Sequence, residues 1–483
     1  MKGIDMSTQP DQTKSPRLQK IIGHYNALAG RREAFLKKNA YYHNLINRQY
    51  RYFIPEGKKV LEVGCGTGDL LNAVKPSQGW GVDVSDWMIA LASKKYPRLK
   101  LTAGTITDLP DGETFDYIIL SGIIGELEDV QDFFTRLKRF CRGDTRIIIE
   151  YYSYLWLIGL RVAERLRLKM PQQILNWLTP SDVKNFLTLA GFETVTTERR
   201  ILMPVYIPVL SALVNRLLGN LPLINAFAMN YFLVARPQES AKEERSVSIV
   251  IPCRNEKGNI ENAVRRTPAF GTHQEFVFVE GGSLDGTYEE TVRVKNAHPD
   301  KDIKILKQTG KGKGDAMRLG FAQAQGDVLM ILDADLTVAP EDLPKFYRAL
   351  VENKGEFING CRLVYPLEKQ AMRFLNLVAN KMFSVFFSWL LGQGFKDTLC
   401  GTKVLRKDRY DEIVRNRGYF GDFDPFGDFD LIFGASKLNL KVVELPVRYY
   451  GREYGQTQIR RFYHGLLLIK MCFFAMRKIK FRR

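Results

Sequence analysis

Val60-Leu-Glu-Val-Gly-Cys-Gly-Thr-Gly-Asp69 is an apolar run that leads directly into three glycines at alternate positions. This pattern is typical of a buried strand followed by a tight turn into a helix, because glycine adopts backbone conformations that other residues avoid. A glycine turn at a helix N-terminus also lets a polar or anionic ligand approach the backbone closely. The stretch therefore predicts an α/β fold with a ligand site at this turn.

The rest of the N-terminal half continues this alternation of strands and helices. Apolar runs typical of buried strands lie at Gly81-Val-Asp83, Phe115–Leu120 and Arg146–Glu150, and Phe232–Ala235 is expected to be the last strand. Thr179-Pro-Ser-Asp182 has the capping residue and the proline of a helix start. We therefore predict a doubly wound parallel sheet with helices on both faces.

A second α/β series begins after a polar, charged segment without periodicity. Val247-Ser-Ile-Val-Ile251 is its first buried strand, and further strand patterns lie at 275–279, 303–306 and 327–332. A chain of 483 residues with 45% apolar side chains is long enough for more than one core. We predict two doubly wound domains at 21–236 and 246–483, preceded by a flexible tail at 1–20 and joined by a linker at 237–245.

The net charge of +18 calls for an anionic partner. The basic residues are dispersed and no helix-turn-helix, zinc-finger or aromatic RNA-binding motif occurs, so we expect no nucleic acid partner. A membrane surface or phosphorylated substrates explain the charge better, because the chain after Glu453 has eight Lys and Arg residues and no acid. Six cysteines without a Cys-x-x-Cys pair fit a reducing cytoplasm.

Membrane-spanning patterns are missing from the sequence. No segment has ~18 uninterrupted apolar residues, and Met1–Lys20 lacks the apolar core of a secretion signal. Gly465–Met476 and Asn376–Leu391 are each interrupted by a lysine. They fit either interfacial helices or ordinary core-facing helices. We expect a cytoplasmic protein that is peripheral on the inner face of the membrane.

The first glycine turn differs from that of a dinucleotide site, because the third glycine of that fingerprint would fall at Asp69. Asp83 ends the next strand, where a carboxylate usually grips ribose hydroxyls. Together with Asp108, the stretches Val60–Leu70 and Gly81–Ser85 resemble the class I S-adenosylmethionine-dependent methyltransferases. The resemblance covers about residues 20–236.

This resemblance implies S-adenosyl-L-methionine as the cofactor. The turn with Gly64, Gly66 and Gly68 would hold the amino acid part of the cofactor, with the support of Glu62. Asp83 would bind the ribose, and Asp108 would lie near the adenine amine. Many relatives have a Glu-His pair after the fourth strand, whereas Ile123-Ile-Gly-Glu-Leu127 has no histidine. The domain is therefore either a methyltransferase with an unknown acceptor or a cofactor-binding module without catalysis.

The second half carries a pair of carboxylates at a strand end. Leu329-Met-Ile-Leu-Asp-Ala-Asp335 delivers Asp333 and Asp335 together, and such a pair can hold a hard divalent cation with diphosphate oxygens as further ligands. The cation neutralises a leaving nucleoside diphosphate. Lys311–Arg318 is basic and glycine-rich, which suits an anionic ligand, although it lacks the Gly-Lys-[Ser/Thr] of a Walker loop.

These motifs, with Val247–Glu256 and Gly282–Thr287, resemble family 2 glycosyltransferases over about residues 246–470. The resemblance implies a nucleotide-sugar-binding domain of the GT-A type that binds Mg or Mn through Asp335 beside Asp333. The implied nucleotide-sugar ligands are Pro252, Arg254, Asn255, Glu256, Glu280, Asp285, Lys311, Lys313 and Asp333. The family commonly has two aspartates where Glu280-Gly281 stands, so UDP- and GDP-linked donors both stay open.

The acceptor side has candidate bases in Phe426–Leu431, which occupies the place of the family's acceptor-side acid. Asp428 is the first candidate and Asp430 the second, because a hydroxyl acceptor needs a general base. A phosphate acceptor is already anionic and needs none.

Several stretches resemble the polyprenyl-phosphate sugar synthase branch of the family: Arg373–Asn376, Asn380, Asp397–Thr402, Tyr454–Thr457 and Arg460-Arg461-Phe462. In that branch, basic residues such as Arg460 and Arg461 would hold the lipid phosphate. We predict a bifunctional enzyme, a methyltransferase followed by a metal-dependent inverting glycosyltransferase that acts on a polyprenyl phosphate or lipid-linked glycan. The alternative is a glycosyltransferase with a hydroxyl acceptor in exopolysaccharide or lipopolysaccharide assembly, joined to a non-catalytic cofactor-binding module.

Overall fold

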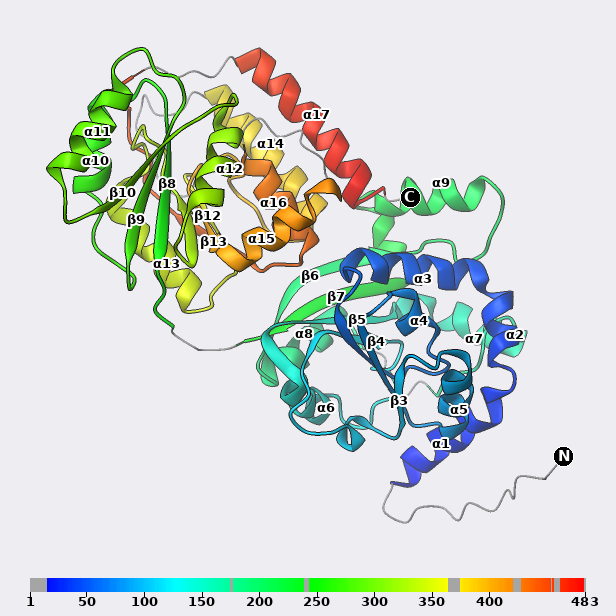
Figure 1. Cartoon of the computed structure of the whole chain (residues 1–483). Helices are drawn as coiled ribbons and strands as arrows, with labels where there is room; N and C mark the ends of the chain where they lie inside the picture. Colours follow the sequence, from blue (N-terminus) through cyan, green and yellow to red (C-terminus); the bar gives the residue numbers. More distant parts are fainter. Residues whose placement is uncertain are drawn as a thin grey trace. The chain divides into compact units, whose positions relative to one another are not determined.

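The computed structural model describes residues 15–173, 176, 178–238, 243–363, 374–419, 427–452, 454–455 and 461–481. The chain divides into two compact units, one that ends at Gln238 and one that begins at Glu239 (Figure 1). Each unit has its own sheet of seven strands. All six cysteines are free thiols.

The sheet of the N-terminal unit has the order β3-β2-β1-β4-β5-β7-β6. Its strands are β1 (Lys59–Val63), β2 (Gln78–Asp83), β3 (Lys100–Ala103), β4 (Phe115–Ser121), β5 (Cys141–Tyr152), β6 (Phe192–Arg200) and β7 (Asn230–Pro237). The first five pair in parallel, which confirms the predicted α/β class. β7 runs antiparallel to both β5 and β6, so the sheet is mixed rather than wholly parallel.

The helices of this unit are α1 (Pro16–Ala29), α2 (Arg32–Lys38), α3 (Ala40–Phe53), α4 (Asp69–Ala73), α5 (Asp86–Lys95), α6 (Val130–Leu137), α7 (Leu157–Arg165), α8 (Pro180–Leu189) and α9 (Leu210–Arg216). α8 begins at the predicted helix start, where Thr179 and Asp182 form a capping box. The tail predicted over 1–20 is wrong in its last part. The Ser15 hydroxyl accepts a bond from the Leu18 amide and Pro16 opens α1, so residues 16–20 are helical.

The sheet of the C-terminal unit has the order β10-β9-β8-β11-β13-β12-β14. Its strands are β8 (Val247–Cys253), β9 (Gln274–Glu280), β10 (Asp302–Lys307), β11 (Val328–Ile331), β12 (Phe357–Cys361), β13 (Lys403–Arg406) and β14 (Val442–Pro446). Only β13 is antiparallel to its neighbours, β11 and β12. In β8, Val250 packs into the core on one face of the sheet and Ile249 and Ile251 into the core on the other, as the two-residue period of a strand requires.

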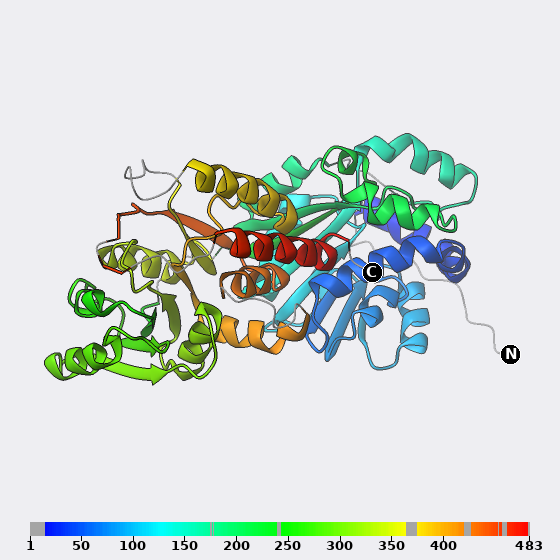
Figure 2. The ribbon, with the colours of Figure 1, turned by 90° about the horizontal axis from the view of Figure 1, so that it is seen from above.

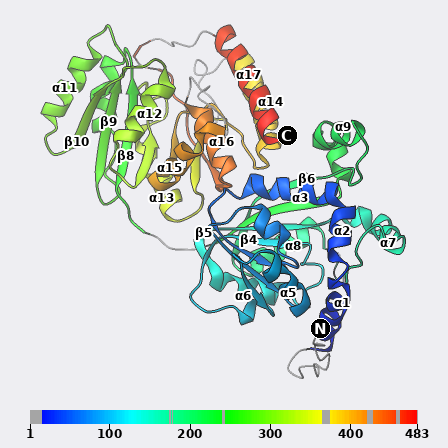
Figure 3. The ribbon, with the colours of Figure 1, turned by 45° about the vertical axis from the view of Figure 1, so that its right-hand side comes forward.

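The helices that cover this sheet are α10 (Ile260–Arg265), α11 (Thr287–Ala297), α12 (Lys313–Gln323), α13 (Leu343–Val351), α14 (Phe374–Leu391), α15 (Lys407–Arg415), α16 (Asp428–Lys437) and α17 (Arg461–Ile479). α14 and α17 lie side by side (Figures 1 and 3). Both bury one side, through residues such as Phe387 and Met471, while Val385 and Phe473 are exposed. Among the described residues, the hydropathy of each helix falls short of what a membrane crossing demands.

Candidate functional site

The loops after β8 and β9 are bonded to one another at the carboxyl end of the second sheet. The Asn255 amide donates to the Ser283 hydroxyl at 2.9 Å, and its side-chain oxygen accepts from the Leu284 amide at 2.9 Å. Asn255 has a φ of 56°, a left-handed conformation that asparagine tolerates better than most residues. Pro252 is the second-last residue of β8, and the buried Glu280 carboxylate accepts from the Ser283 amide at 2.5 Å.

Two further acids from these loops lie at the same edge. Asp285 accepts from the Thr287 hydroxyl at 2.5 Å and from the Tyr454 hydroxyl at 3.3 Å. The Glu256 amide donates to the Thr287 hydroxyl at 3.0 Å. Burial raises the pKa of Glu256 to about 7, although Asn259 and Arg452 act in the other direction. The site thus has a carboxyl group that titrates near neutral pH.

The two aspartates that follow β11 are held in place by different partners. Asp333 forms an ion pair with Lys313 at 2.5 Å, whereas Asp335 accepts from the Thr337 amide at 3.2 Å and its hydroxyl at 2.8 Å. Burial alone would raise the pKa of Asp333, but the Lys313 charge holds it below its ordinary value. Gly401 is required here, since a Cβ at this position would lie 1.9 Å from an Asp333 carboxylate oxygen.

Arg452 joins these acids and was not predicted from the sequence. Its guanidinium forms ion pairs with Glu256 at 3.2 Å and with Asp335 at 2.6 Å. It follows β14 and comes from 117 residues further along the chain than Asp335. No local motif marks such a residue, because only the fold brings it to the carboxylates.

The donor set around Asp335 fits a metal that is shared with a ligand. Among the described residues, no group of three or more His, Cys, Asp or Glu side chains is arranged to hold a metal ion. A divalent ion on Asp335 would therefore take its remaining ligands from elsewhere, and diphosphate oxygens and water are suitable for Mg or Mn. The pairing of Asp335 with a guanidinium shows that this carboxylate accepts a cation at its free oxygen.

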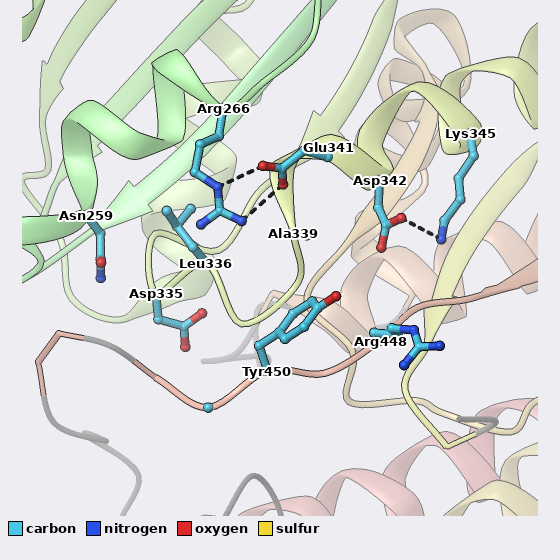
Figure 4. A pocket seen from close by; sticks show the side chains of 11 residues that line it. Asn259, Arg266, Asp335, Leu336, Ala339, Glu341, Asp342, Lys345, Arg448 and Tyr450 are labelled. Atoms are coloured by element: carbon cyan, nitrogen blue, oxygen red, sulfur yellow. Dashed lines mark hydrogen bonds and ion pairs between the residues drawn. The ribbon is translucent and has the colours of Figure 1, made fainter. Parts of the chain in front are cut away.

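A cavity of about 620 Å³ lies next to Asp335, between α10, the loop before α13 and the segment after β14. In Figure 4, Arg266 meets Glu341 through two bonds of 2.8 and 3.1 Å, and Lys345 meets Asp342 at 2.9 Å. The residues that line this cavity are Asn259, Arg266, Asp335, Leu336, Ala339, Glu341, Asp342, Lys345, Arg448, Tyr450 and Gly451. The cavity is polar and offers space beside the carboxylate that is predicted to bind metal.

The predicted acceptor-side acids are ion-paired in the structure. Asp428 begins α16 and lies 2.8 Å from the ammonium of Lys403, which is fully buried. Asp430 pairs with Arg417 at 3.0 Å. The Asp428 carboxylate is therefore already engaged by a buried cation in this geometry. Its base role stays a prediction.

The remaining predicted residues of this unit are less well placed. Arg254 and Lys311 are both exposed, Arg254 just after β8 and Lys311 just before α12. Arg460 lies outside the described residues. Arg461 begins α17, but its side chain is outside the described part of the chain. The structure therefore gathers Asn255, Glu256, Glu280, Asp285, Lys313, Asp333 and Asp335 at one edge of the sheet, together with Pro252.

In the N-terminal unit, the glycine turn lines a cavity of about 510 Å³. Gly64 has a φ of 74°, and a Cβ there would lie 2.3 Å from the Ile123 side chain, so no other residue fits. Asp83 accepts from the Gly66 amide at 2.7 Å and from the Ser85 amide at 2.9 Å. It thereby fixes the turn and also lines the cavity, as do Gly64 and Gly66.

Three of the predicted cofactor residues lie outside the cavity lining. Glu62 is buried beneath the turn, and burial raises its pKa well above the ordinary value. Gly68 caps α4. Asp108 is exposed and its carboxylate accepts from the Thr105 amide at 2.7 Å as part of a capping box. The structure thus uses Asp108 for helix capping, and the residues of this segment that line the cavity are Gly104, Thr105, Ile106 and Thr107.

Arg32 is a further cavity residue that the sequence did not reveal. Its guanidinium lies over the glycine turn, since a Cβ at Gly66 would be 3.7 Å from its Nη2 atom. Its Nε atom is buried and has no hydrogen-bond partner. Buried donors are almost always satisfied, so this cation in a cavity is suited to an anionic ligand group. A cofactor carboxylate on the glycine turn would supply one.

The same cavity contains an acid that is bonded to a tyrosine. Tyr25, on α1, donates its hydroxyl proton to Glu126, and both side chains line the cavity. Burial raises the pKa of Glu126 to about 7, against the opposing effect of the Tyr25 bond. Glu126 belongs to the segment Ile123–Leu127, which has no histidine. The cavity therefore has a carboxylate, in place of a histidine, that can accept a proton near neutral pH.

Comparisons with known proteins find matches for both units. The family model "Glycosyl transferase family 2" matches residues 248–413, and the model "Methyltransferase domain" matches residues 34–197. Dolichol-phosphate mannosyltransferase of Pyrococcus furiosus is 30% identical over 220 residues, which cover 44% of this chain and 59% of the relative. The chain thus spans less than two thirds of that protein.

Two solved structures have a low overall similarity. Glucosyl-3-phosphoglycerate synthase from Mycobacterium tuberculosis is 15% identical with a TM-score of 0.38, covering 50% of this chain and 80% of that one. A methyltransferase from Thermotoga maritima is 14% identical with a TM-score of 0.36, covering 45% and 100%. The two family models thus match separate parts of the chain, a methyltransferase domain that precedes a family 2 glycosyltransferase domain.

Proposed function

We propose that the C-terminal unit transfers a sugar from a nucleoside-diphosphate sugar to a polyprenyl phosphate, with inversion at the anomeric carbon. The observation that carries this proposal is the placement of Asp333 and Asp335 at the end of β11, facing the bonded loops that follow β8 and β9. The similarity to a dolichol-phosphate mannosyltransferase supports the acceptor class. Mg or Mn bound at Asp335 would neutralise the leaving diphosphate.

The side chains of this unit have separable tasks in that reaction. Asp335 would hold the metal after its guanidinium partner, Arg452, has been displaced, and Lys313 keeps Asp333 ionised and in a fixed position beside it. Arg452, once released, is a donor suited to the diphosphate. A phosphate acceptor attacks as an anion, so the pairing of Asp428 with Lys403 is no obstacle to the transfer.

The direct test is nucleoside diphosphate release from UDP- and GDP-sugars, with Mg or Mn, in the presence or absence of a short polyprenyl phosphate. We expect release that requires the lipid phosphate and stops when the divalent ion is chelated, because the donor phosphates need the metal. The preferred nucleotide identifies the donor. Metal-dependent release that is the same with and without the lipid phosphate would rule out this acceptor but retain a glycosyltransferase.

The second candidate is transfer to a hydroxyl acceptor during exopolysaccharide or lipopolysaccharide assembly. It is favoured by the position of Asp428 at the start of α16, in the segment where the family has its acceptor-side acid. An Asp428→Asn variant distinguishes the two candidates. With a phosphate acceptor we expect turnover within about ten-fold of the wild type, whereas a general base contributes roughly 10²- to 10⁴-fold. The substitution also leaves the buried Lys403 without its carboxylate, so calorimetry must show wild-type donor binding before the two candidates are compared.

We also propose that the N-terminal unit binds S-adenosyl-L-methionine and transfers its methyl group, which the bound cofactor carries as an electrophile. Gly64, Gly66 and Asp83 would hold the cofactor, and Arg32 would bind its carboxylate. Glu126 is placed to accept a proton from the acceptor. The shared chain suggests that methyl transfer acts in the same glycan pathway, on the cytoplasmic surface of a membrane.

Arg32→Met should weaken cofactor binding about ten- to a hundred-fold, because it removes a charged donor to the carboxylate, worth roughly 1.5–3 kcal/mol. Calorimetry with S-adenosyl-L-methionine measures this loss. The matched control is Arg31→Met, which changes the exposed neighbouring arginine and should bind like the wild type. Equal affinity of all three proteins would show that Arg32 does not contact the cofactor.

A further inference from the structure

The segment that joins β6 to β7 in the N-terminal unit is apolar yet exposed. Residues 201–229 contain one charged residue, Arg216, and no acid. Val209 and Leu223 are 83% and 86% exposed. The exposed large apolar side chains of this segment are Val205, Tyr206, Ile207, Val209, Leu210, Leu213, Leu217, Leu218, Leu221, Leu223 and Phe227. Soluble domains seldom expose so many neighbouring apolar residues without a partner.

This segment is well anchored, so its exposure does not come from a loose chain. Asn215, on α9, accepts from the amides of Leu202 and Met203, both at 2.9 Å, and donates to the Tyr41 hydroxyl at 3.1 Å. The buried Ser211 hydroxyl donates to the Val205 carbonyl at 2.8 Å. The polar groups face inward, and the fold holds the apolar side chains out toward solvent.

A second exposed apolar segment adjoins the first. It consists of the short helix η3 (Tyr154–Trp156) and α7, in which Leu160 is the only buried residue. The Trp156 indole donates to the Phe227 carbonyl at 2.9 Å and so joins the two segments. The exposed apolar residues of this segment and of the three residues after α7 are Tyr154, Leu155, Ile158, Val162, Leu166 and Leu168. Figures 1 and 2 place α7 and α9 toward one edge of the unit.

The charges around this apolar surface are almost entirely basic. Residues 154–169 contain Arg161, Arg165, Arg167 and Lys169. The single acid of this stretch, Glu164, is neutralised by Lys169 at 2.7 Å. Leucine and aromatic side chains flanked by arginine are the composition of an interfacial surface that meets anionic lipid headgroups. An anionic lipid bilayer matches this surface, because it has negative headgroups above an apolar layer.

We propose that residues 154–168 and 203–227 form a lipid-facing surface through which the methyltransferase domain lies on an anionic membrane. The arginines meet the headgroups, and side chains such as Ile158 and Leu223 enter the acyl boundary. This contact is separate from α14 and α17, which belong to the other unit. It brings the cavity of the N-terminal unit to the bilayer independently of the glycosyltransferase, which suits a methyl acceptor that is itself carried by a lipid.

The test measures sedimentation of the full chain with vesicles. The vesicles consist of phosphatidylcholine alone or contain about 30% phosphatidylglycerol, which gives them the negative surface of an anionic leaflet. We expect binding that requires phosphatidylglycerol and falls roughly ten-fold or more in an Ile158→Asp/Leu223→Asp variant. The matched control, Leu91→Asp/Leu189→Asp, changes two exposed leucines outside the surface and should bind like the wild type. Circular dichroism and S-adenosyl-L-methionine binding verify that each variant folds.

Two results would overturn the proposal. One is unchanged vesicle binding of the Ile158→Asp/Leu223→Asp variant while Phe473→Asp on α17 abolishes it, because the membrane contact would then lie in the C-terminal unit alone. The other is that the wild type sediments as a dimer, whereas the same double variant sediments as a monomer and binds vesicles like the wild type. That result would assign the surface to contact with a second copy of the chain.

Discussion

An Asp335→Asn variant should lose glycosyl transfer by at least about a thousand-fold, because the carboxamide cannot hold a divalent ion against diphosphate oxygens as a carboxylate does. The leaving nucleoside diphosphate then departs without charge neutralisation, and that stabilisation amounts to several kcal/mol. Metal-dependent nucleoside diphosphate release measures the effect. The substitution should leave folding intact, since Thr337 can still donate to the amide oxygen at this position.

The matched control is Asp327→Asn, at the opposite end of the same strand. Asp327 immediately precedes β11 and bonds to Ser246 at 2.7 Å, far from the carboxyl edge of the sheet. This variant should retain activity. If Asp335→Asn turned over at the wild-type rate with the same metal requirement, the metal would not be held at Asp335 and the proposed site would be wrong.

The second large effect is expected on stability, at Asp397. This fully buried carboxylate meets Arg362 through two side-chain bonds of 2.7 and 2.9 Å, and it also accepts from the Arg362 amide at 3.0 Å. Removing one partner of a buried pair leaves the other charge uncompensated, which costs about 3–5 kcal/mol. Asp397→Asn should therefore lower the free energy of unfolding of the C-terminal unit by about that amount.

A pair of similar geometry at the surface provides the control. Arg406 and Asp408 also form two bonds, of 3.0 and 2.7 Å, but both side chains are at least 40% exposed. Exposed pairs contribute about 0–1 kcal/mol, so Asp408→Asn should hardly change the thermal unfolding temperature. Chemical denaturation of the two variants compares the effects. Similar stabilities for Asp397→Asn and Asp408→Asn would mean that the Arg362 charge finds another partner or reaches water.

The features that the sequence predicts well are those encoded by neighbouring residues. The glycine turn at 64–68 and the aspartates at 333 and 335 follow apolar strands, so their place at a sheet edge can be inferred from local pattern. The resemblance implies that Asp108 lies near the adenine, and that role stays a prediction. Thr105, three residues earlier, forms a capping box with Asp108, and this local interaction decides the position of the side chain in the structure.

Arg32 and Arg452 were missed for a different physical reason. Arg32 reaches the glycine turn from α2, and Arg452 reaches Asp335 from the segment after β14. Arginine is common at protein surfaces, and neither of these two residues belongs to a recognisable sequence motif. Their contacts exist only once the sheet has ordered distant segments, so neither propensity nor periodicity could reveal them.

The guanidinium between Glu256 and Asp335 has a consequence for the order in which ligands enter. An internal counter-ion makes metal loading an exchange rather than a simple addition, so free Mg or Mn must compete with a tethered cation. A metal that arrives already chelated by a nucleoside-diphosphate sugar avoids this competition, because the diphosphate offers the displaced arginine a new anion. The kinetics should therefore show the metal–donor complex, and not the free ion, as the species that binds first.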